Sequence, residues 1–428
     1  MTVAALFVLF TVLLVVGVPI AFAMGLSAVA ILILFSDVPL LVLPQRFFSS
    51  LDSFPLMAIP LFILAGNLMN VSGITQAIVR FAAALIGHVR GGLGQVNILT
   101  SLLFSGISGS AAADVAAVGS MLLPAMRREG YKPEWSVVIT AASAILGPII
   151  PPSLLMVLYG AMTGLSIGTL FLAGILPGLV IAALLMLFTW WMADEIGGTR
   201  HDRASPAEVG RAFRRAAPAL VLPVLIIGGI QSGVFTATEA GVLAVAYALA
   251  YGLAARELGP RNLFGFVREA AVSTSSILII LGGAALFSWI IAREGFPAQL
   301  AQGLSALTEN RHVALGLIVL ALLALGMFVE TISALILVTP MLAPIGSTFG
   351  IDPVHFAMVV IVTVLLGSIT PPVAIILLLA CRIGGVDYAR AIRPFLPYFG
   401  IILIGLLVIA YVPAVTLFVP RAFGGYDP

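Results

Sequence analysis

The chain has 428 residues, of which 61% are hydrophobic and only 9% are charged, so it has too few polar side chains to cover the surface of a water-soluble protein. The formal net charge of +2 is small and spread over many loops, which argues against a nucleic-acid-binding protein. Cys381 is the single cysteine, which excludes an internal disulfide and a cysteine-based metal cluster. The composition indicates an all-α, polytopic membrane protein.

Apolar segments of about 20 residues, the length that crosses a bilayer as a helix, recur along the whole chain. We predict ten membrane spans, and we expect residues 73–87 and 297–309, which are too polar to span, to form helices along the membrane interface. The longest polar stretch, 193–216, is expected to be a linker rather than a folded domain. The predicted spans cover residues 3–17, 19–35, 54–70, 135–161, 169–192, 217–232, 238–254, 271–291, 356–380 and 394–418.

Residues 95–126 and 314–344 each have two short apolar arms around a small or polar centre. Basic residues and a histidine flank the first segment on both sides, which places both of its ends in the cytoplasm by the positive-inside rule. They are His88, Arg90, Arg127, Arg128 and Lys132. The ends of the second segment lack this positive excess and are expected to be periplasmic. We therefore predict two re-entrant helical hairpins that enter from opposite faces, with tips at 105–114 and 326–333.

The second part of the chain repeats the first. At a distance of 220, six glycines and prolines recur in order: Gly130, Pro133, Gly147, Pro151, Pro152 and Pro177 match Gly350, Pro353, Gly367, Pro371, Pro372 and Pro397. Asp114 and Glu330 are 216 apart, which predicts a four-residue insertion near 343–346. Because the charges on equivalent loops are reversed, we interpret the chain as an inverted repeat of residues 1–192 and 217–428. The linker between them is expected to be cytoplasmic because it carries Arg200, Arg203, Arg211, Arg214 and Arg215.

A pair of adjacent prolines interrupts each of two predicted spans, 135–161 and 356–380. A proline lacks an N–H group and leaves the carbonyl four residues earlier without its helical partner. The carbonyls concerned are those of Gly147, Pro148, Gly367 and Ser368. An unpaired carbonyl is costly inside a membrane, so such a break persists only where protein, water or an ion satisfies it. A lone proline would most simply be a kink, but the duplicated pair favours a binding site.

The tips and breaks are rich in oxygen atoms, which are the ligands that sodium prefers, and the N-termini of broken helices suit an anionic substrate. Asp114 and Glu330 could attract an ion, or each could cap the second arm of its hairpin. The candidate sodium- and substrate-binding residues of the first half are Ser105, Gly106, Ser108, Gly109, Ser110, Asp114, Gly147, Pro148, Pro151 and Pro152. Those of the second half are Gly326, Glu330, Thr331, Ser333, Gly367, Ser368, Thr370, Pro371 and Pro372.

An enzyme is one alternative to test at this point, because "GISG" at residues 106–109 matches the short motif of intramembrane serine proteases. Such a serine needs a histidine base on a neighbouring span. The four histidines fall in loops or at the ends of predicted spans, and the sequence has no HExxH metal motif and no nucleotide-binding loop. We therefore expect a transporter without catalytic residues or cofactors, apart from sodium as a coupling ion.

Five motifs together resemble the large membrane subunit of tripartite ATP-independent periplasmic (TRAP) transporters. They are "SGISGSAAADVAAVGSMLLPAMRREGY", "GPIIPPS", "GVFTATEAG", "PMLAPIGSTFGIDPVHF" and "GSITPPV", and the resemblance covers nearly the whole chain. It implies a multi-pass secondary transporter of a bacterial inner membrane. The implied partners are a small four-helix membrane subunit and a periplasmic substrate-binding protein. The implied substrates are organic acids such as C4-dicarboxylates or sialic acid, taken up with sodium.

The resemblance also implies an elevator mechanism, in which the hairpins and broken helices form a transport domain that slides against a scaffold. One sodium site would lie between residues 105–110 and 147–152, the other between residues 326–331 and 367–372, and the substrate between the two tips. Thr363 and Ala374 stand where members of the family usually have Asn and Gly. Two alternatives stay open: proton coupling through Asp114 and Glu330, and a passive channel or scaffold subunit.

Overall fold

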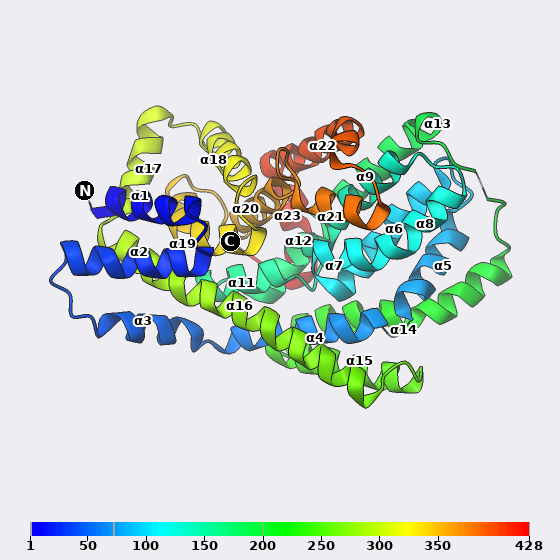
Figure 1. Cartoon of the computed structure of the whole chain (residues 1–428), viewed down its shortest axis with the longest axis horizontal. Helices are drawn as coiled ribbons and strands as arrows, with labels where there is room; N and C mark the ends of the chain where they lie inside the picture. The colour runs from blue at the N-terminus through cyan, green and yellow to red at the C-terminus, as the bar shows by residue number, and fades with distance from the viewer. Residues whose placement is uncertain (1, 72, 200, 428) are drawn as a thin grey trace.

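The computed structural model describes residues 2–71, 73–199 and 201–427, and helices make up most of this part of the chain (Figure 1). Arg200 of the linker lies outside the described residues. The only extended pairing within these ranges is an isolated antiparallel bridge between Tyr131 and Gly197. The prediction of an all-helical protein is therefore confirmed.

The N-terminal region contains α1 (Thr2–Val15), α2 (Ile20–Phe35), α3 (Val42–Leu51) and α4 (Ala58–Val71). The helix α3 was not predicted, and it is bent by 60° relative to the following helical segment. Pro55 lies in the short 3-10 turn Phe54–Met57 that connects them. The helices α2 and α4 both pack against α16 (Pro260–Arg293), and α4 also packs against α15 (Ala237–Ala254).

The first predicted hairpin is formed by α6 (Gly92–Ser108) and a second arm that runs from Ala111 to Arg128. This arm consists of α7 (Ala111–Asp114), a π-helical segment (Val115–Gly119) and α8 (Ser120–Arg128). The amphipathic α5 (Ile74–Ile86) precedes the hairpin. The next span is broken, as predicted, into α9 (Pro133–Ala144), α10 (Leu146–Ile149) and α11 (Leu154–Thr163). The long α12 (Ile167–Trp191) and the short α13 (Ala193–Ile196) follow.

The predicted linker 193–216 is partly helical, because α14 (Pro206–Gln231) begins ten residues before the end of that stretch. A capping box starts this helix early: the Ser205 hydroxyl accepts from the Glu208 N–H, and the Glu208 carboxylate accepts from the Ser205 N–H. The two helices after α16 are α17 (Phe296–Leu307) and α18 (Arg311–Gly326).

The second predicted hairpin pairs α18 with α19 (Thr331–Thr348), and the second broken span comprises α20 (Pro353–Gly367) and α21 (Ile375–Gly384). The chain ends with α22 (Tyr388–Tyr411) and α23 (Pro413–Gly424). The bounds of the span predicted at 394–418 are therefore wrong, because the helix that could cross the membrane there covers Tyr388–Tyr411. Pro413 cannot continue the hydrogen-bonding pattern of α22, and it begins a separate helix instead.

The number of spans is lower by length and composition than the ten predicted. Among the described residues, seven helices are long and apolar enough to cross a membrane, or eight if the bent pair of α3 and α4 counts as one span. The helices α1, α2, α18, α20 and α21 are apolar but shorter. Three of these shorter helices have a clear reason to be short: α18 is a hairpin arm, and α20 and α21 are the two parts of a broken span, so each needs to cover only part of the membrane thickness.

An offset of 220 relates several helices of the two predicted halves. The second arms of the hairpins cover residues 111–128 and 331–348, and the helices α12 and α22 stop at Trp191 and Tyr411. The helix α19 runs without interruption through residues 343–346, so the predicted insertion there is wrong. At this offset the counterpart of Glu330 is Ser110, not Asp114.

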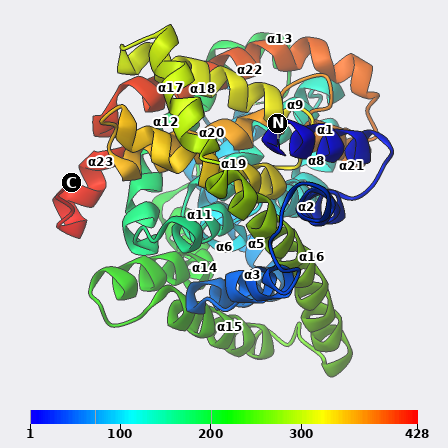
Figure 2. The ribbon, with the colours of Figure 1, turned by 90° about the vertical axis from the view of Figure 1, so that its left-hand side faces the viewer.

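The broken helices lie at the centre of the molecule. The most apolar window of the α9–α11 span is 94% buried, whereas that of α14 is only 22% buried, and every residue of α20 from Val354 to Gly367 is buried. Figures 1 and 2 show α3, α14 and α15 along one side of the molecule and α13, α17 and α22 along the opposite side. The candidate site is therefore enclosed by protein.

A buried hydrogen bond joins α12 and α22. The hydroxyls of Thr189 on α12 and Tyr398 on α22 lie 2.8 Å apart, and both side chains are fully buried. We expect Tyr398→Phe to lower the free energy of unfolding by about 1–3 kcal/mol, because the Thr189 hydroxyl loses its partner in an apolar environment. Thermal melting of the purified protein in detergent measures the change. The double variant Tyr398→Phe/Thr189→Val should recover most of the loss, and a double variant as unstable as the sum of both single variants would contradict this account.

Candidate functional site

The two hairpin tips and the two broken helices meet around one small cavity. It has a volume of about 100 Å³. The residues that line it are Gly109, Ser110, Ala111, Ala112, Pro148, Leu154, Leu155, Glu330, Thr331, Ile332, Leu365, Ser368 and Ile376. Segments more than 200 residues apart in the sequence thus contribute to one enclosed site.

The first tip lies directly against the first break. Gly109 ends α6 with a positive φ of 57°, which reverses the chain, and the Ser110 hydroxyl then accepts a hydrogen bond from the Ala113 N–H. A Cβ atom on Gly109 would lie 2.8 Å from the Pro152 carbonyl oxygen, and one on Gly147 would lie 3.2 Å from the Ser110 carbonyl. Backbone therefore contacts backbone here, which requires glycine on each side.

The second tip contacts the second break in the same way. A Cβ atom on Gly367 would lie 2.5 Å from the Gly326 Cα atom, and one on Gly326 would lie 2.7 Å from the Gly367 Cα atom. Real Cβ atoms essentially never come within 3.0 Å of such neighbours. The end of α18 and the end of α20 can approach this closely only because both residues are glycine.

Two of the carbonyls predicted to be unpaired have partners, so that part of the prediction is wrong. The Ser153 hydroxyl donates to the Pro148 carbonyl and also caps α11 by accepting from the Met156 N–H. The Thr370 N–H donates to the Gly367 carbonyl at 2.9 Å, in a turn tighter than the α-helix. Short-range turns and caps thus satisfy groups that the proline rule alone leaves free.

The second break is held by a tyrosine that the sequence reasoning missed. The Tyr388 hydroxyl donates to the Pro372 carbonyl at 2.8 Å and lies 3.2 Å from that of Val373. Ala374 follows with φ of 42°, a left-handed conformation that favours glycine. The Pro151–Pro152 and Pro371–Pro372 peptide bonds are both cis. Thr363 bonds within its own helix, to the Val359 carbonyl at 2.6 Å.

The two acids that were predicted to attract an ion or cap a helix differ. Glu330 is a cap: its Oε2 atom accepts from the Ser333 N–H at 3.0 Å and from the Ser333 hydroxyl at 3.2 Å. Asp114 is not a cap, because Ser110 occupies that position. The Asp114 side chain is fully buried, its Oδ2 atom accepts from the Ser101 hydroxyl at 2.7 Å, and its Oδ1 atom has no partner.

A line of buried polar side chains leads away from Asp114 between α6 and α9. Ser101 lies 3.1 Å from Ser143, the Ser143 hydroxyl donates to Asn97 Oδ1 at 3.3 Å, and Asn97 Nδ2 donates to the Thr140 hydroxyl at 2.7 Å. None of these four residues was among the candidates. The signal in the sequence is the spacing of Asn97 and Ser101, four residues apart in an apolar arm, which puts both on one helix face.

No basic side chain compensates Asp114 among the residues that the structure describes, since the ion pairs there join Arg90 to Asp194 and His201 to Glu129. A carboxylate so enclosed is very costly unless it binds a proton or a cation. The described residues contain no group of three or more His, Cys, Asp or Glu side chains that could hold a transition metal. The surrounding hydroxyl and amide oxygens suit a hard cation instead.

The cavity itself offers an anion backbone N–H groups rather than basic side chains. Glu330 is the only charged residue in its lining. Helices begin next to it at Ala111, Leu154, Thr331 and Ile375, and the first N–H groups of a helix lack partners within the helix and carry a partial positive charge.

Some predicted site residues lie outside the cavity. Ser105 donates to the Leu102 carbonyl within its own helix, and Gly106 packs against the Pro223 ring of α14. The Ser108 hydroxyl is buried without a partner. Asp114 and Ser333 also do not line the cavity. The tip residues that line it are Gly109, Ser110, Ala111 and Ala112 in the first half and Glu330, Thr331 and Ile332 in the second.

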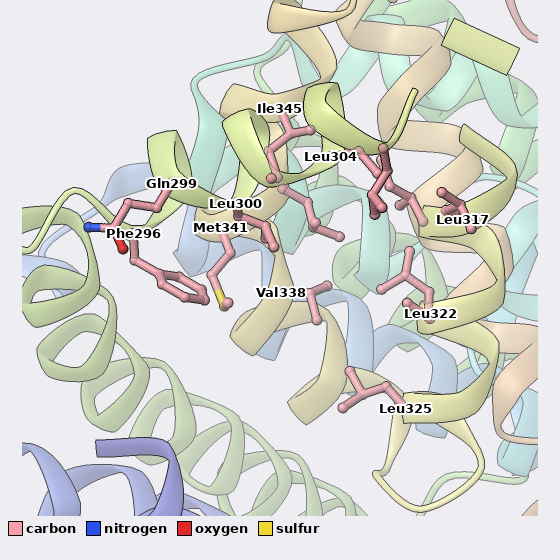
Figure 3. A pocket seen from close by; sticks show the side chains of 15 residues that line it. Phe296, Gln299, Leu300, Leu304, Leu317, Leu322, Leu325, Val338, Met341 and Ile345 are labelled. Carbon is pink, nitrogen blue, oxygen red and sulfur yellow. The ribbon is translucent and has the colours of Figure 1, made fainter. Parts of the chain in front are cut away.

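A much larger cavity lies elsewhere, between α17, α18 and α19, and has a volume of about 800 Å³ (Figure 3). Figure 3 shows Phe296, Leu322 and Met341 pointing into it, with Gln299 at its margin. Its lining is apolar apart from Gln299, so it lacks the converging polar groups that an organic anion needs.

Comparison with known proteins places these features in a family. The family model described as the DctM component of tripartite ATP-independent periplasmic transporters matches residues 7–415. The sialic acid TRAP transporter large permease protein SiaM of Vibrio cholerae is 39% identical over 96% of both chains. The C4-dicarboxylate TRAP transporter large permease protein DctM of Rhodobacter capsulatus is 34% identical over 99% of this chain and 100% of the relative. The crystal structure of the Alcanivorax borkumensis YdaH transporter shares the fold, with a TM-score of 0.62 over 89% of this chain and 88% of that one, at 16% identity.

The contact between Gly326 and Gly367 can be tested directly. We expect Gly367→Ala to destabilise the protein by about 1–3 kcal/mol, because a methyl group at this position collides with backbone atoms that cannot rotate away. The matched control is Gly400→Ala, a helical glycine with nothing within 4 Å of an added Cβ atom, which should be neutral or slightly stabilising. Thermal melting of both variants decides the matter, and equal melting temperatures would show that the two breaks do not need this close approach.

Proposed function

Because the chain belongs to the DctM family of tripartite ATP-independent periplasmic transporters, we propose that it is the transporting subunit for sodium-coupled uptake of an organic acid across a bacterial inner membrane. The observation that carries this proposal is the cavity in which both hairpin tips and both broken helices meet. Relatives named as sialic acid and C4-dicarboxylate permeases support a carboxylate as the substrate class. Its proposed partners are a small membrane subunit and a periplasmic binding protein that delivers the substrate.

The charge pattern of the cavity supports coupling to a cation. A carboxylate that enters meets Glu330 and no basic side chain in the lining, so helix N-termini alone must attract it against a negative charge. Sodium ions at the two breaks would supply the missing positive charge. Affinity for substrate and affinity for sodium then increase together, which is the reciprocal coupling that a symporter needs.

The proposed sodium sites use the tip–break contacts. One lies between Ser110 and the Gly147–Pro148 segment, and the other lies between Gly326 and the Gly367–Thr370 segment. Each region combines carbonyl and hydroxyl oxygens with backbone approaches that only glycine permits, which favours small oxygen-ligated cations. Asp114, Ser101 and Ser143 form a third oxygen-rich location, and Asp114 is four residues after Ser110 in the sequence.

The size of the cavity supports a moving element. A pocket for an organic ligand typically has a volume of roughly 300 Å³ or more, whereas the cavity between the tips has about 100 Å³. Substrate therefore enters only when the tips separate. We propose that the hairpins and the buried broken helices move as one transport domain, in an inverted-repeat architecture, against a scaffold that includes α2, α4, α15 and α16.

Proton coupling is the second candidate, and one observation favours it. The Oδ1 atom of Asp114 is buried without a partner, and a proton satisfies such a carboxylate as well as a sodium ion does. The two candidates differ in the ion gradient that drives uptake: in the proton-coupled case, a pH gradient would drive uptake without sodium.

Uptake in reconstituted vesicles tests the coupling ion. The chain is reconstituted with its small subunit, and the binding protein delivers labelled sialic acid or succinate. We expect accumulation only with an inward sodium gradient, because the cavity lacks the positive charge that the substrate needs. Accumulation driven by a pH gradient with potassium in place of sodium would instead establish the proton-coupled alternative.

Asp114→Asn tests the buried carboxylate, since asparagine keeps the shape but removes the charge. If Asp114 takes part in cation binding, we expect uptake at subsaturating sodium to fall by about tenfold or more, with part of the loss recovered at high sodium. The matched control is Glu239→Gln, because Glu239 is an exposed acid that belongs to the capping box of α15 and does not line the cavity. Unchanged sodium dependence in Asp114→Asn would assign this residue a purely structural role.

A further inference from the structure

A second polar cavity lies between α5, α14 and α15, away from the hairpin tips, and has a volume of about 550 Å³. Four arginines line it: Arg80 from α5, and Arg211, Arg214 and Arg215 from the first turns of α14. Tyr251 of α15 forms part of the wall, and Glu208 is the only acid in the lining. The helices α5 and α14, which are well separated in the sequence, therefore both contribute arginines to one cavity.

The positive charge of this cavity is not neutralised within the part of the chain that the structure describes. None of the four guanidinium groups has a carboxylate within 4.0 Å there, whereas Arg90 pairs with Asp194. The Glu208 carboxylate is occupied by the helix cap, accepting from the Ser205 N–H at 2.8 Å and from the Ser205 hydroxyl at 3.0 Å. The lining therefore carries four positive charges and one negative charge, an excess of positive charge.

The walls of the cavity are fixed by contacts on both sides. The rings of Phe81 on α5 and Phe213 on α14 lie with their centroids 5.6 Å apart. The Tyr247 hydroxyl of α15 donates to the Pro218 carbonyl of α14 at 2.7 Å. The arginines are therefore carried by elements that pack against one another.

Exposed apolar side chains lie next to the lining residues in the sequence. Phe213, between the lining residues Ala212 and Arg214, is 49% exposed, and Leu253, two residues after Tyr251, is 61% exposed. The helix α5 is amphipathic, with Ile74, Ile78 and Ala82 buried on its other face. Charged residues next to exposed apolar ones are typical of the membrane interface, and the arginine excess indicates its cytoplasmic side.

We propose that this cavity binds the phosphate-bearing headgroup of an anionic phospholipid of the cytoplasmic leaflet, such as phosphatidylglycerol or cardiolipin. Guanidinium groups bind phosphate oxygens through paired hydrogen bonds, and basic pockets between membrane helices are suited to such headgroups. The acyl chains lie along the exposed apolar surface next to Phe213. Arginines that served only to set the orientation of the chain would not need to converge on one cavity from two helices.

The bound headgroup holds α5 against α14. The helix α5 also packs against α6, the first arm of the first hairpin, so the lipid lies one helix away from the candidate transport site. This inference rests on the membrane location of the chain and does not depend on the coupling ion, the substrate or the elevator motion.

Lipid retention by the purified protein tests the proposal. The full chain is purified in detergent, incubated with phosphatidylglycerol or with phosphatidylcholine of the same acyl chains, and analysed by native mass spectrometry. We expect the wild type to retain at least about fivefold more phosphatidylglycerol, since each arginine near a membrane surface contributes on the order of 1 kcal/mol. Equal retention of both lipids by the wild type would overturn the proposal without any variant.

Variants then locate the site. Arg80→Gln/Arg211→Gln/Arg215→Gln should reduce phosphatidylglycerol retention to the level of phosphatidylcholine. The matched control Arg203→Gln, an exposed arginine of the same linker that does not line the cavity, should behave as the wild type. Equal losses in both variants would show that general surface charge is responsible, and the site would be refuted.

A competition distinguishes a lipid headgroup from a soluble anion. Inorganic phosphate is added in large excess over the lipid before the measurement. We expect the phosphatidylglycerol signal to persist, because the acyl chains add apolar contacts that free phosphate cannot make. Displacement by phosphate alone would assign the cavity to a soluble anion and overturn the lipid proposal.

Discussion

The architecture depends on one constraint: a helix that breaks inside a membrane must find partners for the polar groups that the break exposes. Here the partners come from close range. Ser153 and Thr370 donate to carbonyls that precede the proline pairs. The Tyr388 hydroxyl lies within hydrogen-bonding distance of the Pro372 and Val373 carbonyls at the second pair. The hairpin tips then contact the breaks at glycine positions, so that protein and not lipid surrounds both breaks. A cavity can exist between the tips and the breaks only because these contacts are made.

The same constraint determines the chemistry of the cavity. Two broken helices and two hairpin tips bring four helix N-termini to one cavity, and we propose that their N–H groups hold an anion without any arginine or lysine. A site built in this way from backbone would distinguish the class of ligand more than the individual acid. This agrees with a family whose members are named for acids as different as sialic acid and C4-dicarboxylates.

The sequence predicted the elements of the fold better than the details of the site. The hairpins, the broken spans and the helices at 73–87 and 297–309 follow from composition and proline spacing, which act locally. The prediction that Asp114 and Glu330 are equivalent positions was wrong, because it matched the two acids by their charge and not by their place in the helix. The residues that cap the second hairpin arms are Ser110 and Glu330.

The network of Asn97, Ser101, Thr140 and Ser143 was missed for a different reason. Its members are common polar residues, and only the packing of α6 on α9 brings them together. The free carbonyls were overestimated because the proline rule considers only the helix and ignores turns and side-chain caps that close it again. Local rules therefore give the location of such a site, and tertiary contacts decide which of its atoms are available.

The most direct test of the central claim is whether sodium alone changes the environment of the hairpin tips. Cys381 is buried and is the only native cysteine, so Cys381→Ala provides a background for Ser110→Cys and for Thr331→Cys. The rate of maleimide labelling at each position is measured in sodium and in potassium at equal ionic strength. Our account predicts that sodium slows labelling at both tips, because an ion bound at each break holds the tip against it. Equal rates in the two salts at both positions would contradict the assignment of the tips and breaks as the sodium-binding elements.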